Sequence, residues 1–136
     1  MRSMVWAAGA VSATAIGLVI AAGLAADGDA PGERVPPTAT GTLEELAAKA
    51  ECAPAVQTDA QELRQANCRT GAGRFVLATF ATDRGERDWL NQAKDYGGTY
   101  LVGRKWVAVG TPRTLTTLRT HLGGTLEHST HHTDAP

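Results

Sequence analysis

The longest uncharged stretch of the chain begins near its amino terminus and limits what remains to fold. Residues 3–26 contain no charged side chain, and at a helical rise of about 1.5 Å each they would cross a hydrocarbon layer about 30 Å thick. Ser3, Ser12 and Thr14 are the only polar residues in the run, so the segment lacks the polar face of an amphipathic helix. We interpret residues 1–26 as a transmembrane signal anchor, which leaves the rest of the 136-residue chain to fold.

The charges around this segment predict its orientation. Arg2 precedes it, and three acidic residues follow within residues 27–33. The positive-inside rule then predicts a single-pass protein of the cytoplasmic membrane with its carboxyl-terminal domain outside. A cleaved signal peptide is the alternative, because small residues at Gly23 and Ala25 resemble a cleavage site, and the domain would then be secreted. Both interpretations export the domain.

Composition divides the exported part into three segments. Residues 27–41 are rich in proline and glycine and almost free of apolar residues, which predicts a disordered linker. Patterns of regular structure occupy residues 42–125, where we expect one domain. Residues 126–136 have no periodic apolar positions and are interpreted as a flexible tail.

Three helices are expected in the domain from their capping residues. Thr42 and Glu45 form a capping-box pattern at the start of the first helix. The second is expected over residues 84–96, where apolar positions recur at helical spacing. A cap at Thr111 and the following proline begin the third, and Gly123 ends it.

Runs of β-branched and aromatic residues between these helices predict antiparallel strands. The stretch from Thr58 to Cys68 could equally form a helix, because its periodicity is ambiguous. Together the patterns predict an α+β fold, a small two-layer domain with an antiparallel sheet and the helices on one face. The strands are expected over residues 55–58, 63–70, 74–81, 99–102 and 105–109.

The last two strands carry apolar residues on both faces. A two-residue turn at Gly103 and Arg104 would pair Leu101 with Trp106. This alternation predicts that Trp106 is buried against the helices. The opposite face would be a candidate partner patch if no other element covered it, since contiguous apolar surface on a small domain usually marks an interface. That patch consists of Tyr100, Val107 and Val109.

Cysteine and histidine provide the remaining candidate sites. Fifteen residues separate Cys52 from Cys68, the only two cysteines, and in an oxidising compartment we expect them to form a disulfide. A redox-active pair is the alternative, although the spacing is far from C-x-x-C. The four histidines, all near the carboxyl end, could share a transition metal, although a mobile polar tail is favoured, so no metal and no cofactor are expected. They are His121, His128, His131 and His132.

Several function classes find no support in the pattern. Lys and Arg total 13 against 14 Asp and Glu, with the signs interspersed, so no nucleic-acid partner is expected. No nucleophile elbow, phosphate-binding loop or metalloprotease motif occurs, so a non-enzymatic protein without catalytic residues is expected.

Three stretches carry a resemblance to a known group of proteins. They are "ELRQANC", "GRFVLATFATDRG" and "DWLNQAKDYGGTYLVGRKWVAVG". Over roughly residues 43–125 the chain resembles a family of small exported proteins of high-GC Gram-positive filamentous bacteria that has no assigned function. The resemblance implies membrane-anchored or secreted placement with the two cysteines retained. It implies no catalytic residues.

The leading hypothesis is therefore a non-enzymatic domain, tethered to the membrane by its amino-terminal helix, that contacts an unknown protein partner in the bacterial cell envelope. The alternative is an envelope enzyme or metal-handling protein that uses the histidine-rich carboxyl-terminal tail.

Overall fold

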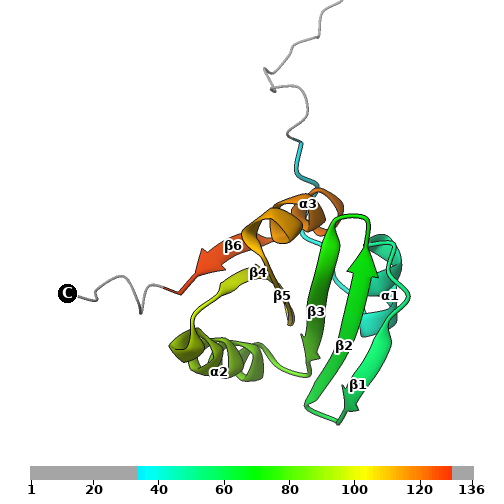
Figure 1. The fold of residues 1–136 in the computed structure, drawn as a ribbon. Coiled ribbons are helices and arrows are strands. Elements are labelled where there is room, and N and C mark those ends of the chain that lie inside the picture. The colour runs from blue at the N-terminus through cyan, green and yellow to red at the C-terminus, as the bar shows by residue number, and fades with distance from the viewer. Residues whose placement is uncertain (1–33, 130–136) are drawn as a thin grey trace, which may run out of the picture. The chain divides into compact units, whose positions relative to one another are not determined.

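A computed structural model describes residues 34–129 of the chain. These residues form three α-helices and six strands, which confirms the α+β class (Figure 1). The elements are, in chain order, α1 Leu43–Lys49, β1 Ala55–Asp59, β2 Leu63–Thr70, β3 Gly73–Phe80, α2 Asp83–Ala93, a 3-10 turn η2 Lys94–Tyr96, β4 Thr99–Gly103, β5 Trp106–Gly110, α3 Pro112–Leu122 and β6 Thr125–His128.

One sheet contains all six strands. Their order is β1-β2-β3-β5-β4-β6, and every neighbouring pair is antiparallel. The ambiguous stretch from Thr58 to Cys68 contains the end of β1, the connection to β2 and most of β2, and no helix. In β2 the alternate residues Ala66 and Cys68 are buried while Asn67 is exposed. A period of two marks a strand with one face in the core.

Helices lie on both faces of the sheet, so the prediction of two layers with the helices on one face is wrong. Leucines of α1 and α3 share a core with Trp106, whereas Leu90 of α2 packs with Tyr100 and Val107. Trp106 and Val107 are neighbours in β5, and their side chains point to opposite faces. Because β5 carries apolar side chains on both faces, both faces must be shielded from water. Helices α1 and α3 pack on one face, and α2 packs on the other.

Trp106 is buried against α1 and α3, as predicted, in the cluster of buried side chains that we call the larger core. Its side chain is fully buried, and its Nε1 donates a hydrogen bond to the carbonyl oxygen of Ala39 at 2.8 Å. The Ala39 N–H in turn donates to Leu122 at 2.8 Å. A Cβ atom at Gly103 would overlap the Trp106 ring, so only glycine leaves room for the indole there. Residue 39 therefore belongs to the fold, and the predicted linker over residues 27–41 extends too far.

The β4–β5 hairpin differs in register from the prediction. Gly103 pairs with Trp106, so Arg104 and Lys105 form the turn, and Lys105 adopts a left-handed φ of 64°. Leu101 consequently faces Ala108 and not Trp106. The shift moves each partner by two residues, so every side chain keeps the face that the alternation predicted.

The predicted caps are confirmed at α1 and α3. The Thr42 hydroxyl accepts from the Glu45 N–H at 3.1 Å, and the Glu45 carboxylate accepts from the Thr42 N–H at 2.8 Å. Thr111 caps α3, and Gly123 follows it with a φ of 71°. Each cap satisfies amide or carbonyl groups that a helix end leaves without a partner.

The described part of the predicted tail is folded. Residues 125–128 form the edge strand β6 against β4, and Leu126 packs on the larger core. The carboxylate of Glu127 accepts hydrogen bonds from Lys94 and Arg87. Burial acts to raise the pKa of Glu127, but these two cations outweigh it and lower the pKa. The prediction of a flexible tail is therefore wrong up to residue 129, and residues 130–136 lie outside the described residues.

Truncation after Thr125 is expected to lower the free energy of unfolding by at least about 1 kcal/mol. In a domain of this size such a loss lowers the melting temperature by about 4 to 8 °C, so a decrease of more than about 5 °C is expected. The truncation removes the partly buried Leu126 and both ion pairs of Glu127. Truncation after Ser129 keeps these groups and serves as the control. Equal thermal melting of the two truncated proteins would contradict a structural role for β6.

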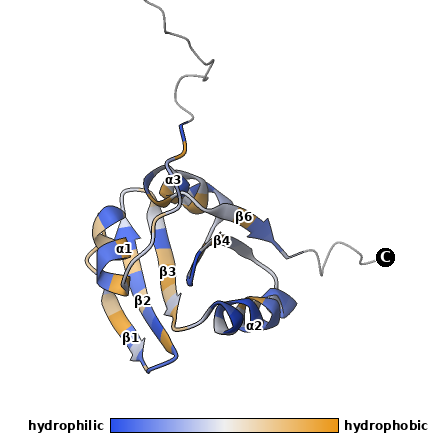
Figure 2. Cartoon of the chain, turned by 180° about the vertical axis from the view of Figure 1, so that it is seen from behind, coloured by the Kyte–Doolittle hydropathy of each residue, from blue (hydrophilic) through white to orange (hydrophobic). Residues whose placement is uncertain are grey.

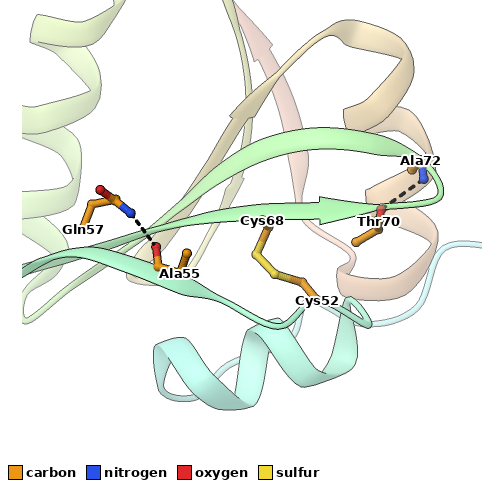
Figure 3. The surroundings of a disulfide bond; sticks show 6 residues. All are labelled: Cys52, Ala55, Gln57, Cys68, Thr70 and Ala72. Carbon is orange, nitrogen blue, oxygen red and sulfur yellow. Dashed lines mark hydrogen bonds between the residues drawn. A yellow bond between two sulfur atoms is a disulfide. The ribbon is translucent and has the colours of Figure 1, made fainter.

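The two cysteines form a disulfide, as predicted. Cys52 follows α1 and Cys68 lies in β2, with their Cα atoms 5.6 Å apart (Figure 3). Both side chains are buried in the larger core. The bond therefore fastens the short helix α1, which has only seven residues, to strand β2 of the sheet.

None of the helices over residues 34–129 is long and apolar enough to cross a membrane. The segment predicted to do so, residues 1–26, lies outside the described residues.

Candidate functional site

The three residues predicted as a partner patch do not form an exposed surface. Tyr100 and Val107 are buried because α2 lies over them, and Val109 is half-buried at the border of this cover. The Tyr100 hydroxyl also donates to the carbonyl oxygen of Ala93, the last residue of α2, at 2.9 Å. Burial raises the pKa of this tyrosine. The partner-patch prediction is therefore wrong for Tyr100 and Val107, which α2 covers, and only Val109 borders an uncovered surface.

The same face of the sheet is uncovered farther from α2. Figure 1 shows α2 beside the β4 and β5 side of the sheet and away from β1 and β2. Along one row across the strands, Ala55 pairs with Asn67, Asn67 with Val76, and Val76 with Val109. Exposure rises along this row, from half-buried Val109 and Val76 to exposed Asn67 and Ala55. We call this surface the open face, formed by Ala55, Asn67, Arg69, Arg74, Val76 and Val109.

Two arginines form the next row of the open face. Arg69 in β2 and Arg74 in β3 stand directly opposite each other, beside the hairpin turn at residues 71–72. Directly opposed side chains have Cβ atoms about 4.5 to 5.5 Å apart, and like charges at that position destabilise a sheet. Both arginines are exposed, and within residues 34–129 neither guanidinium forms an ion pair or a side-chain hydrogen bond. The open face therefore holds two uncompensated positive charges.

A groove lies over the open face. It has a volume of about 610 Å³ and is lined by all six open-face residues together with Ala53, Cys68 and Phe75. Figure 2 shows hydrophilic and hydrophobic residues following one another along β3, as expected for a strand whose two faces differ in environment. On the open face itself, β2 contributes the polar Asn67 and Arg69, and β3 contributes Arg74 and Val76. The groove is therefore apolar at Val76 and Val109 and basic at the arginine pair.

A neighbouring arginine, Arg64, is neutralised by acidic side chains of the domain, unlike Arg69 and Arg74. Arg64, also in β2, donates to the carboxylates of Glu44 and Asp59 at 2.8 Å each. Its hydrogen bonds lower the pKa of Glu44 to about 2. This arginine helps line a second groove of about 480 Å³ near the β4–β5 turn, and its charge there is already neutralised within the domain.

The histidines give no metal centre within the described residues. His121 is exposed at the end of α3, and His128 in β6 lies 3.2 Å from the Thr99 hydroxyl through its Nδ1. Over residues 34–129 no group of three or more potential metal-ligating side chains comes together. His131 and His132 lie outside the described residues.

One buried carboxyl group is only half satisfied. Glu86 in α2 is buried, and its Oε1 accepts the backbone N–H of Lys105 at 2.7 Å. Its Oε2 has no hydrogen-bond partner in the structure. Burial raises the pKa of Glu86 above the ordinary value of 4.5. The group holds the β4–β5 turn against α2 and does not face the groove over the open face.

Glu86 is expected to make stability depend on pH. Because its pKa is raised on folding, the folded state binds the proton more tightly, so its stabilising contribution is complete below pH 4.5 and is lost as the pH rises through the folded-state pKa. The free energy of unfolding of the parent should therefore fall relative to that of Glu86→Gln as the pH rises above 4.5. Urea titrations at several pH values measure this difference. A difference that stays constant with pH would contradict the assignment.

No family model, curated protein or solved structure matches this chain. The family resemblance drawn from the three sequence stretches stays a prediction, and function has to be argued from the geometry of the described residues.

The arginine pair was not singled out from the sequence, although the information was present. Gly71-Ala72-Gly73 is a turn signal in the sequence. A two-residue loop that pairs Thr70 with Gly73 places the next residues, Arg69 and Arg74, opposite each other. The exposure of these two residues depends on which half of the sheet α2 covers, and the sequence does not reveal the position of α2.

Proposed function

We propose that the domain is an exported binding module that contacts a partner in the cell envelope through the open face, and that it acts without catalysing a reaction. The observation that carries this proposal is the groove of about 610 Å³ over a half-covered sheet, with two uncompensated arginines at one end. An exposed sheet surface that combines apolar floor and unpaired charge is a typical recognition surface.

The disulfide supports the placement outside the cytoplasm. Disulfides persist in oxidising compartments and are rare where thiols are kept reduced. The bond between Cys52 and Cys68 is buried in the core, as befits a structural bond. Together with the uncharged residues 3–26, it supports a domain tethered on the outer side of the membrane.

Position-resolved crosslinking tests the proposed surface. A photoreactive residue is placed at Asn67 on the open face in the full chain, and at Thr116, which is exposed on α3 and therefore lies toward the other face. After irradiation of membranes, position 67 is expected to give discrete protein adducts that position 116 does not give. Identical adducts at both positions, or none at position 67, would show that the open face is not the binding surface.

A further inference from the structure

We propose that the open face recognises carboxylate groups of an extended acidic peptide segment, which the arginine pair binds while neighbouring apolar side chains of the peptide lie on Val76 and Val109. This inference rests on the proposed binding function and names the chemistry of its partner. It follows from three properties of the surface: the charge, the geometry of the donors, and the spacing of the rows.

The charge on the open face favours an anionic group. Arg69 and Arg74 face each other across one strand pair, and within the described residues no acidic side chain neutralises them. Elsewhere the domain does supply such partners, as Glu127 does for Arg87 and Lys94. A bound anion would relieve the repulsion between the two opposed guanidinium groups, so the free surface is complementary to negative charge.

The identity of the donors favours carboxylate. Each guanidinium presents planar, paired N–H donors that match the two oxygens of a carboxylate group. The exposed side-chain amide of Asn67 lies on the same face, two residues from Arg69, and can both donate to and accept from a peptide backbone. A purely basic surface for a lipid headgroup would not need this amide or the apolar floor beside it.

The spacing of the rows favours an extended peptide. On one face of a strand, successive rows are two residues apart, about 6.8 Å at about 3.4 Å per residue. An extended ligand repeats its own side chains at the same interval. A segment lying along β2 and β3 can therefore place an acidic side chain at the arginine row and its next same-side residue, if apolar, at the row of Val76 and Val109.

Binding of a defined peptide tests the inference. The full chain, purified in a neutral detergent, is titrated into a fluorescent peptide of repeating Glu-Ser-Val-Ser, capped at both ends, in which glutamate and valine alternate on the same side of an extended chain. Fluorescence anisotropy reports binding. The same measurement is made with a peptide in which glutamine replaces glutamate. Inorganic phosphate and vesicles of anionic phospholipid are used as competitors, to distinguish carboxylate recognition from phosphate recognition.

Two double variants with equal loss of charge are compared. Arg69→Gln/Arg74→Gln removes the pair, and Arg104→Gln/Arg113→Gln removes two exposed arginines outside the groove. Because hydrogen bonds to charged groups contribute strongly to affinity, the first variant is expected to bind the glutamate peptide with a dissociation constant at least about tenfold higher than the parent. The second variant is expected to bind it like the parent. Circular dichroism confirms that both variants are folded.

The remaining outcomes separate this inference from the proposed function. Equal binding of the glutamine peptide, equal loss in both variants, or displacement by phosphate or vesicles at lower concentration than by unlabelled glutamate peptide would each overturn carboxylate recognition. If the glutamate peptide does not bind while adducts still form from position 67, the inference is wrong and the proposed function stands. If neither peptide binding nor adducts occur, both are wrong.

Discussion

Replacement of Trp106 by alanine is expected to lower the free energy of unfolding by roughly 3 to 5 kcal/mol. The indole is fully buried among leucines of both α1 and α3. Its Nε1 also holds Ala39 to the core at 2.8 Å. The substitution therefore leaves a large cavity and a buried carbonyl oxygen without its donor. A domain of this size is expected to have a total stability of about 5 to 10 kcal/mol, so much of the population could unfold.

Urea denaturation followed by circular dichroism measures this effect. Tyr96→Ala is the matched control, because that aromatic side chain is 89% exposed and should contribute little to the core. If Trp106→Ala unfolds at the same urea concentration as the parent or the Tyr96 variant, the account of the core is wrong.

Removal of the disulfide by Cys52→Ala/Cys68→Ala is expected to cost roughly 2 to 4 kcal/mol of unfolding free energy. The two cysteines are 16 positions apart, and closing a loop of about 15 residues restricts the unfolded chain by about 3 kcal/mol in the loop-entropy model. The bond also fastens α1, which is too short to be stable as an isolated helix.

Reductant provides the control for this prediction. It should destabilise the parent by a similar amount and leave the double variant unchanged, and intact mass should show two fewer hydrogens in the unreduced parent. Free thiols in the native parent, or equal stability of parent and variant, would contradict a structural disulfide.

Local patterns in the sequence were sufficient for most elements of the fold. Hydroxyl side chains at Thr42 and Thr111 mark helix starts because they satisfy free amide groups within three residues. The alternation around Trp106 predicted which side chains share a face, even though the turn lies one residue later than expected. These features depend only on neighbours in sequence, so they could be derived without the tertiary structure.

Features that depend on distant contacts could not be derived in this way. Leu126 is the one large apolar residue of the four-residue strand β6, and only pairing with β4 makes that segment a strand. By composition Ala39 belongs to the predicted linker, and only the hydrogen bond from the Trp106 indole to its carbonyl oxygen makes it part of the fold. The position of α2 decides both that Tyr100 is buried and that Arg69 is exposed. The candidate site therefore lies on the uncovered half of the sheet and not on the β4–β5 hairpin, where the sequence placed it.

The most direct test of binding through the open face is the reactivity of its arginines in the membranes of cells that make the protein. An arginine-selective dicarbonyl reagent is applied to these membranes and to the purified full chain, and mass spectrometry quantifies modification at each site. Arg69 and Arg74 should react more slowly in membranes than in the purified protein, while exposed Arg104 reacts alike in both. Equal reactivity of Arg69 and Arg74 in the two preparations would contradict a partner on the open face.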